Sequence, residues 1–296
     1  MKPSIETASG MRRSFVNPGV GAILPRAHTQ IKLEDFSLEA TLDSGQVFGF
    51  SKIADRVYEG YIAGRRLKLW QEGTTLQSDL PPDAASETIL RNYFDLDRDL
   101  SPVYEFLAED ERLVPALRRF RGLRLIRQDS WEALACFILS SNNNIKRIQG
   151  IWKNLSAYFD CAFPTARQIA RTHERILRQI GLGYRAPYLL NTASFLATNP
   201  FTLDRIRKAP YAEARELVIA FPGIGPKVAD CVLLYGFQKY ESFPVDVWIL
   251  RALRKLYFKN RALTEKKARA FGQKRWENLA GYVQQYLFHG ARNGIL

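Results

Sequence analysis

The chain has 296 residues, and its 43 Lys and Arg against 30 Asp and Glu give a formal net charge of +13 at pH 7. Its hydrophobic content of 46% and aromatic content of 12% are those of a globular protein and exclude an intrinsically disordered chain. This basic excess favours a polyanion or an anionic membrane surface as partner. Because no apolar run is long enough to cross a bilayer and no N-terminal segment resembles a secretion signal, nucleic acid is the stronger expectation and no membrane partner is expected.

The positive charge is unevenly distributed along the chain. From Arg251 to the C-terminus there are eleven Lys or Arg against only Glu265 and Glu277. A second basic cluster consists of Arg118, Arg119, Arg121, Arg124 and Arg127. Solvated helix faces would explain any single one of these residues, but the asymmetry between the halves favours a nucleic-acid face in the C-terminal half.

Cysteine and histidine give no sign of a metal or redox centre. The three cysteines are Cys136, Cys161 and Cys231, and the three histidines are His28, His173 and His289. Three scattered thiols cannot supply the four ligands of an iron–sulfur cluster, and an odd number favours free thiols in a reducing compartment. No metal and no cofactor are therefore expected.

The N-terminal third is expected to be a loose tail followed by a β-sheet domain. Residues 1–27 lack periodicity and predict a tail, and a mitochondrial presequence is a weak alternative because Glu6 lies within it. Residues 28–125 are assigned to an antiparallel sheet domain with short helices. The expected strands, separated by Gly-containing turns, are residues 36–42, 47–53, 57–62 and 66–70.

Residues 126–296 have a helical texture, so the expected fold is α+β with a larger all-helical domain following the sheet. Asp129 or Ser130 is placed to begin a helix, with Glu132 positioned to close a capping box. An apolar stripe from Ile145 to Phe159 predicts the next helix. The remaining expected helices are residues 131–139, 166–180, 186–197, 211–221, 227–237, 247–256, 265–271 and 277–291.

The strongest local motif lies between two of these helices, and it is Phe221-Pro222-Gly223-Ile224-Gly225-Pro226-Lys227. It is typical of a helix-hairpin-helix. Its glycines allow a tight turn and a close approach to phosphate, while the N–H groups that open the second helix face the anion. This contact ignores base identity and indicates binding to the DNA backbone. A plain helical turn is the alternative, and the basic surroundings disfavour it.

Lys227 begins the second helix of this hairpin, and Asp246 follows nineteen residues later in Pro244-Val245-Asp246. Asp246 is a good N-cap, which would by itself explain an Asp at that position. The helix dipole disfavours a charged lysine at a helix N-terminus and so favours the neutral amine, which is the nucleophilic form. The pair therefore suggests a nucleophile beside a carboxylate, and an exposed Lys with a simple cap remains the alternative.

Several segments together resemble the 8-oxoguanine DNA glycosylase/lyase family of the helix-hairpin-helix Gly/Pro-Asp superfamily. The resemblance extends over residues 30 to 291. The hairpin and Pro244-Val245-Asp246 carry the superfamily resemblance, whereas the narrower one rests on five further segments. These are Ser44-Gly45-Gln46-Val47-Phe48, residues 124–129, residues 140–147, Gly181-Leu182-Gly183-Tyr184-Arg185-Ala186 and Gln284-Gln285-Tyr286-Leu287-Phe288.

The resemblance implies an enzyme that flips 8-oxoguanine paired with cytosine out of double-stranded DNA, excises it and cleaves the strand by β-elimination. Lys227 would form a Schiff base with the sugar, and Asp246 would stabilise the charge that develops there. Neither step requires a cofactor. A monomer is expected, located with the nucleoid in the bacterial cytoplasm or in the nucleus of a eukaryote.

The resemblance also implies roles for the residues that would hold the DNA. The lesion base would contact the Gly45 carbonyl, Cys231, Gln284 and Phe288. A turn glycine is the alternative for Gly45, and ordinary core positions are the alternative for Cys231 and Phe288. Asn142 and Tyr184 would fill the gap in the stack, and Arg147 and Arg185 would hydrogen-bond the orphaned cytosine. For the asparagine, a capping and turn cluster is the alternative. The DNA backbone would contact Gly223, Gly225, Val228 and Trp248.

Trp248 departs from the family pattern, because the animal enzymes carry a histidine near a phosphate at this position. Indole donates one hydrogen bond but carries no charge, which puts that phosphate contact in doubt. Two rival functions remain open. One is a glycosylase of the same superfamily for another damaged base, and the other is a non-catalytic DNA-binding protein that uses the hairpin as a clamp.

Overall fold

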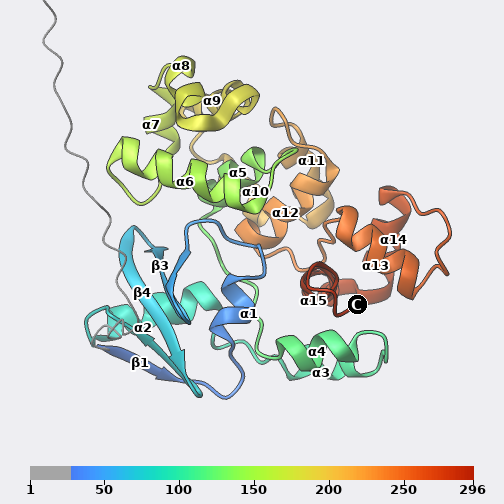
Figure 1. Cartoon of the computed structure of the whole chain (residues 1–296). Coiled ribbons are helices and arrows are strands. Elements are labelled where there is room, and N and C mark those ends of the chain that lie inside the picture. Colours follow the sequence, from blue (N-terminus) through green and yellow to red (C-terminus); the bar gives the residue numbers. More distant parts are fainter. Residues whose placement is uncertain (1–27) are drawn as a thin grey trace, which may run out of the picture.

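The computed structural model describes residues 28–296, and the expected tail and the presequence alternative lie outside these residues. A five-stranded antiparallel sheet forms the N-terminal part and is followed by a larger helical part (Figure 1), which confirms the expected α+β fold. No helix within the described residues is long and apolar enough to cross a membrane.

The sheet has the spatial order β1-β5-β4-β3-β2, and each neighbouring pair is antiparallel. Its strands are β1 (Thr29–Lys32), β2 (Ser51–Ala54), β3 (Val57–Ile62), β4 (Arg65–Glu72) and β5 (Thr75–Ser78). Helix α2 (Ala84–Phe94) contributes its buried Leu90 and Phe94 to the same hydrophobic core as Leu67, Leu69 and Leu76 of the sheet. Burial of these apolar side chains stabilises the N-terminal part.

The sequence predicted β3 and most of β4 correctly but was wrong for residues 36–42. These residues form no strand, and Leu38–Leu42 is helix α1, whose cap Ser37 accepts a hydrogen bond from the Ala40 amide at 3.2 Å. A run this short has no decisive periodicity, so the side-chain cap determines its structure. Strand β2 begins only at Ser51, because Val47, Phe48 and Phe50 are buried on the preceding loop.

The helical part contains most of the expected helices within a few residues of their predicted ends. Those that the sequence predicted are α5 (Ser130–Leu139), α6 (Ile145–Phe159), α9 (Ala186–Thr198), α11 (Tyr211–Ile219), α12 (Pro226–Phe237), α13 (Val247–Leu256), α14 (Glu265–Trp276) and α15 (Ala280–Arg292). The sequence did not locate α2, α3 (Ser101–Ala108), α4 (Val114–Phe120) or α10 (Thr202–Lys208), and the helix expected from residue 277 begins with the 3-10 turn η3 (Glu277–Leu279) before α15.

The single helix expected over residues 166–180 is wrong. The chain instead forms α7 (Ala166–Ala170), α8 (Glu174–Leu177), a π turn η1 (Arg178–Leu182) and a 3-10 turn η2 (Gly183–Arg185). The helical path breaks between Ala170 and Glu174, where Thr172 donates its hydroxyl to the Gln168 carbonyl at 2.9 Å, and it breaks again at Gly181, whose φ of 114° is not helical.

The capping box expected at Glu132 is also wrong. Asp129 caps α5 by accepting from the Glu132 amide at 2.9 Å, but the Glu132 carboxylate faces the other way and accepts from Trp152 Nε1 at 2.8 Å. The spacing in the sequence fits a capping box, but the Glu132 carboxylate accepts from the Trp152 indole of α6 in place of the Asp129 backbone amide.

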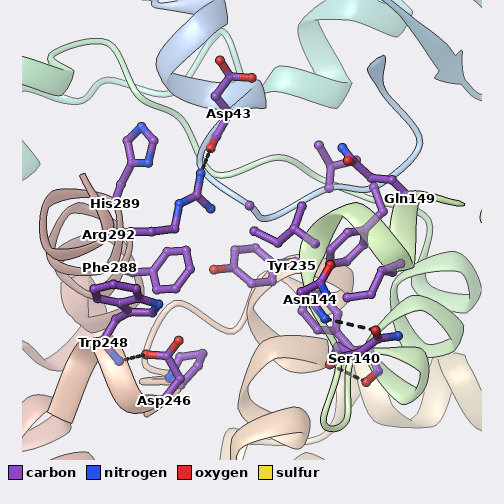
Figure 2. A pocket seen from close by; sticks show the side chains of 18 of the residues that line it. Asp43, Ser140, Asn144, Gln149, Tyr235, Asp246, Trp248, Phe288, His289 and Arg292 are labelled. Carbon is purple, nitrogen blue, oxygen red and sulfur yellow. Dashed lines mark hydrogen bonds between the residues drawn. The ribbon is translucent and has the colours of Figure 1, made fainter. Parts of the chain in front are cut away.

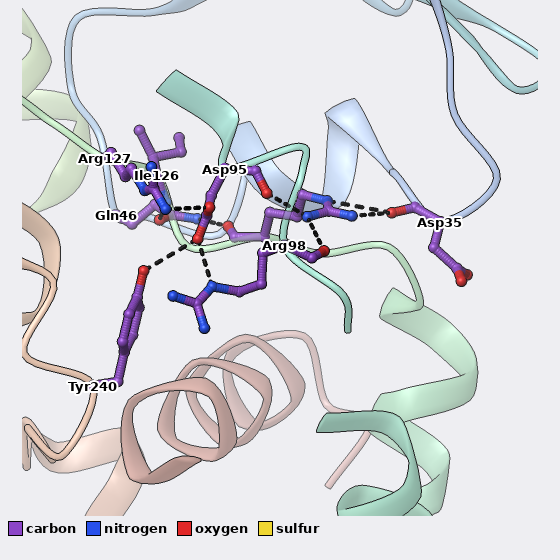
Figure 3. A network of polar contacts seen from close by, with 8 residues as sticks. Asp35, Gln46, Asp95, Arg98, Ile126, Arg127 and Tyr240 are labelled. Carbon is purple, nitrogen blue, oxygen red and sulfur yellow. Dashed lines mark hydrogen bonds and ion pairs between the residues drawn. The ribbon is translucent and has the colours of Figure 1, made fainter. Parts of the chain in front are cut away.

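A polar network joins the sheet part to the helical part (Figure 3). The buried carboxylate of Asp95, which ends α2, accepts from Arg98 at 2.6 Å and from Tyr240 at 3.2 Å, and it pairs with Arg127. Arg124 is buried beside it and donates to the Arg98 carbonyl at 3.0 Å. Part of the basic cluster 118–127 is therefore structural, which neither the nucleic-acid face nor the solvated-face alternative predicted.

Candidate active site

One cavity of about 940 Å³ collects residues from both parts of the molecule. Its wall includes the loop after α1, the end of α5, the start of α6, and parts of α12, α13 and α15 (Figure 2). Six of the residues singled out in the sequence line it: Gly45, Lys227, Asp246, Trp248, Gln284 and Phe288. The first and last of these lie 243 positions apart in the chain, so the fold rather than the local sequence assembles this site.

The hairpin that carries Lys227 has the geometry of a phosphate-binding turn. Gly223 has a φ of 77°, and a Cβ there would lie 2.5 Å from Cδ2 of the Tyr188 ring, so only glycine fits. Gly225 is the N-cap of α12 and supplies no side-chain bond to its opening N–H groups, which leaves them available for an anion. Val228 is buried, so only its backbone is suited to contact DNA.

Lys227 reaches from the first turn of α12 toward the cavity. Its Nζ lies 6.0 Å from the centroid of the Phe137 ring. The Cys231 thiol lies one turn further along the same helix and is buried, and this burial raises its pKa to about 11 although the Lys227 charge acts in the opposite direction. The thiol is thus protonated at neutral pH and presents a small apolar surface rather than a second nucleophile.

Asp246 both caps a helix and lines the cavity, so its capping role is compatible with a second role in the site. Its Oδ1 accepts from the Trp248 amide at 3.0 Å and from the Ile249 amide at 2.9 Å at the start of α13. Burial raises the pKa of the carboxyl group above its usual value, while these backbone bonds and the nearby Lys227 charge oppose that shift. The caps fix the orientation of the carboxylate relative to the cavity.

The loop that carries Gly45 is held by glutamine side chains on either side. The buried Gln46 amide donates to the Thr41 carbonyl at 3.1 Å and to the Arg124 carbonyl at 2.8 Å. Gln128 donates to the Gln46 carbonyl at 2.6 Å. Gly45 itself has a φ of 81°, and a Cβ there would lie 2.9 Å from Ile145 Cδ1, so both its conformation and its surroundings require glycine.

The residues expected to hold the base divide into two groups. Gln284 and Phe288 lie one turn apart on α15 and line the cavity. The Oε1 atom of Gln284 is buried and has no hydrogen-bond partner within residues 28–296, as expected of a group that waits for a ligand. Cys231 is buried and is not part of the cavity wall in this structure.

The residues expected at the orphaned cytosine lie beside the cavity rather than in its wall. Asn142 is exposed with a φ of 48°, a left-handed conformation that asparagine tolerates. Tyr184 is 47% exposed, and its hydroxyl donates to the Ser141 carbonyl at 3.1 Å. Arg147 is exposed at the start of α6.

Arg185 has a structural role that the sequence did not reveal. It is only 2% exposed, and its guanidinium donates to the Ser141 carbonyl at 2.8 Å and to the Asn142 carbonyl at 2.9 Å. These bonds hold the turn that presents Asn142. Because Nε and Nη2 are used in this way, only Nη1 remains for a contact with a base.

The sequence missed several aromatic and polar residues of the cavity wall. Phe137 and Tyr235 stack with ring centroids 5.4 Å apart, and Tyr235 donates through its hydroxyl to Gln285. Both occupy positions on apolar helices that are indistinguishable from ordinary core positions in the sequence. Arg292 also lines the cavity, and nothing in the sequence separates it from the other basic residues of the C-terminal half.

Comparisons with known proteins agree with this geometry. Residues 28–134 match the N-terminal domain of 8-oxoguanine DNA glycosylase, and residues 135–278 match the HhH-GPD superfamily of base excision DNA repair proteins. A probable N-glycosylase/DNA lyase of Methanothermobacter thermautotrophicus is 34% identical over 90% of this chain and 97% of its own length.

Two solved structures are similar over nearly the whole chain. One is the 8-oxoguanine glycosylase/lyase of Clostridium acetobutylicum bound to double-stranded DNA with cytosine opposite 8-oxoguanine. It is 29% identical with a TM-score of 0.84 and covers 91% of this chain and 99% of that chain. The other, MBOgg1 in complex with a low-affinity DNA ligand, is 33% identical with a TM-score of 0.85 and covers 90% and 95%.

Proposed function

The chain belongs to the 8-oxoguanine DNA glycosylase family of the HhH-GPD superfamily, and we propose that it excises 8-oxoguanine paired with cytosine and then cleaves the DNA strand. The observation that carries this proposal is the position of Lys227 and Asp246 in the wall of the same cavity as Gly45, Gln284 and Phe288. A nucleophile and a carboxylate thus face a space with base-binding groups, which a simple DNA clamp would not require.

Lys227 supplies the nucleophile. Its neutral amine attacks C1′ of the deoxyribose, and the bond between C1′ and the base breaks with its electron pair leaving on the base. Opening of the sugar converts the amine adduct to a Schiff base. This imine acidifies the C2′ protons, and loss of one of them expels the 3′ phosphate and cuts the strand.

Asp246 stabilises the positive charge that develops on the sugar during attack. The two backbone amides that it accepts from at the start of α13 keep the carboxylate in one orientation. A carboxylate fixed in this way requires little reorganisation during the reaction, which is the condition for effective electrostatic stabilisation.

The Gly45 carbonyl reads the lesion. 8-Oxoguanine carries a hydrogen on N7 that a carbonyl can accept, whereas guanine presents a lone pair that the same carbonyl repels. The glutamine bonds around the loop support this role because they hold Gly45 in place. Phe288 stacks on the flipped base, and the free Gln284 Oε1 meets its pairing edge.

The residues beside the cavity hold the DNA from which the base has been flipped out. Asn142 enters the gap, Tyr184 wedges the stack, and Arg147 with the remaining Nη1 of Arg185 donates to the orphaned cytosine. The hairpin amides around Gly223 and Gly225 bind phosphate. With DNA as substrate, the enzyme acts at the nucleoid in a bacterium or in the nucleus in a eukaryote.

Borohydride trapping tests the proposal on a duplex with one 8-oxoguanine opposite cytosine. Borohydride reduces the imine to a stable protein–DNA adduct, so the wild-type protein is expected to form a lesion-dependent adduct that Lys227→Gln abolishes. Lys266→Gln, the same change at an exposed position of α14, serves as the matched control and is expected to trap normally. Release of the base without any adduct would overturn the lysine mechanism, and DNA binding without release would favour another lesion or the clamp.

A further inference from the structure

Arg292, the last residue of α15, lines the cavity and extends its guanidinium between Asp43 and Phe288 (Figure 2). Its Nη2 donates to the Asp43 carbonyl at 2.6 Å, and its guanidinium carbon lies 5.6 Å from the centroid of the Phe288 ring. The side chain therefore lies between the loop that carries Gly45 and the aromatic ring on which the base would stack.

The other terminal nitrogen of Arg292 has no partner in the part of the chain that the structure describes. Nη1 is shielded from solvent and makes no hydrogen bond within the residues that the structure describes. It is also adjacent to Gly45, because a Cβ built on that glycine would lie only 2.7 Å from it. Burial lowers the pKa of Arg292, as expected for a cation that has lost water without gaining a full set of acceptors.

A purely structural role explains only half of this side chain. A tie between α15 and the Asp43 loop accounts for the bond from Nη2. It does not account for the buried Nη1, because a buried donor without an acceptor costs free energy relative to a solvated one. An acceptor supplied by the substrate would remove that cost.

We propose that Arg292 Nη1 donates to the C8 oxygen of the flipped 8-oxoguanine, so that Arg292 and the Gly45 carbonyl read the lesion together. This inference rests on the proposed function. N7–H and C8=O are adjacent on the five-membered ring, so a donor beside an accepting carbonyl is complementary to that edge. Guanine offers a C–H in place of the C8 oxygen and would leave Nη1 unpaired, and a site built in this way discriminates strongly against the analogue that lacks the acceptor.

Single-turnover assays on three duplexes test this inference. The first carries 8-oxoguanine, the second 8-thioguanine, whose sulfur is a much weaker acceptor while N7–H is kept, and the third an abasic site. Arg292→Met keeps the length of the side chain without the donor. We expect it to slow excision of 8-oxoguanine about tenfold or more, and to affect both 8-thioguanine excision and abasic-site cleavage far less.

The deciding quantity is the coupling between the two changes, which is the slowing by Arg292→Met on 8-oxoguanine divided by its slowing on 8-thioguanine. This ratio isolates the one contact between Arg292 and the C8 substituent. Equal slowing on both bases would overturn the inference and leave Arg292 as a structural tie. If Arg292→Met does not fold, Arg292→Gln replaces it, because its side chain keeps a polar amide but ends two bonds short of the position of Nη1, and the same coupling is expected. Failure of the wild-type protein to release 8-oxoguanine at all would instead overturn the proposed function.

Discussion

The Gln285 side chain donates a 3.0 Å hydrogen bond to the Ser44 carbonyl, 241 positions away in the chain. Its Oε1 accepts from the Tyr235 hydroxyl, so one amide on α15 connects the cavity wall of α12 to the loop that carries Gly45. The Gly45 loop, which we propose reads the lesion, belongs to the sheet part of the molecule, whereas Lys227 and Asp246 belong to the helical part. Gln285 therefore helps to fix the distance between recognition and chemistry.

Replacement of Gln285 by Leu should separate these two tasks. The change leaves the buried Ser44 carbonyl and Tyr235 hydroxyl without this partner, at a cost of about 1–3 kcal/mol for each buried group. We expect a lower Tm, and a larger loss of 8-oxoguanine excision than of abasic-site cleavage, because only excision requires the Gly45 loop. Gln273→Leu removes a comparable bond, to the Glu241 carbonyl at 3.1 Å, far from the loop. Equal losses of the two activities in Gln285→Leu would contradict a role in positioning.

Asp246→Asn should slow excision about a hundredfold, a magnitude typical of removing one electrostatic stabiliser, with little loss of stability because Asn caps helices as well as Asp. Burial raises the pKa of Asp246, so the active carboxylate should be lost as the pH falls, beginning above the usual range of an aspartate. The single-turnover rate against pH should show this acid limb in the wild-type protein and lack it in Asp246→Asn. An unchanged limb in the variant would assign the titration to another group.

The positions of Lys227 and Asp246 in one site could be predicted from the sequence because each stands in a local motif. Gly223 and Gly225 mark the hairpin, Lys227 follows it directly, and Pro244 marks the turn before Asp246. Such signals depend on a few neighbouring residues. The helical part was predicted well for the same reason, since its apolar stripes repeat within single helices.

The remainder of the site depends on contacts between distant segments, which no local pattern encodes. The partner of Gln285 lies in the first loop, and the neighbour of Gly45 is Arg292 at the other end of the chain. The same limit explains the errors at residues 36–42 and at Glu132, where a side-chain cap and the Trp152 indole determined the outcome.

Arg147→Ala should relax the preference for cytosine opposite the lesion without affecting stability. The side chain is exposed and makes no ion pair within residues 28–296, so its removal should leave the Tm unchanged. Loss of its donors to cytosine should reduce the preference for cytosine over the other bases about tenfold, the order of magnitude of one good base contact. Arg171→Ala, at an exposed position away from the cavity, is the matched control. Excision rates measured opposite each of the four bases would show the effect, and an unchanged preference would remove Arg147 from the readout of the opposite base.

Glu132 should make the protein less stable as the pH rises toward neutrality. Burial raises the pKa of its carboxyl group to about 7 from 4.5, and the Trp152 bond opposes this shift. Between these two pH values the folded protein binds a proton that the unfolded chain has released. The stabilising contribution is therefore complete below about pH 4.5 and is lost as the pH rises through about 7, by up to about 3 kcal/mol.

Urea unfolding of Glu132→Gln at pH 5 and pH 8 tests this linkage. The glutamine oxygen can still accept from Trp152 Nε1, so the variant should match the wild-type protein near pH 5 and exceed its free energy of unfolding at pH 8. The exposed Glu111→Gln is the control and should show no such crossover. The Tyr93 hydroxyl and the Cys136 thiol beside Glu132 also have pKa values raised by burial and stay neutral in this range, so they cannot produce the effect. If the difference in free energy of unfolding between Glu132→Gln and the wild-type protein is the same at both pH values, Glu132 is ionised in the folded protein throughout, with water reaching the carboxylate.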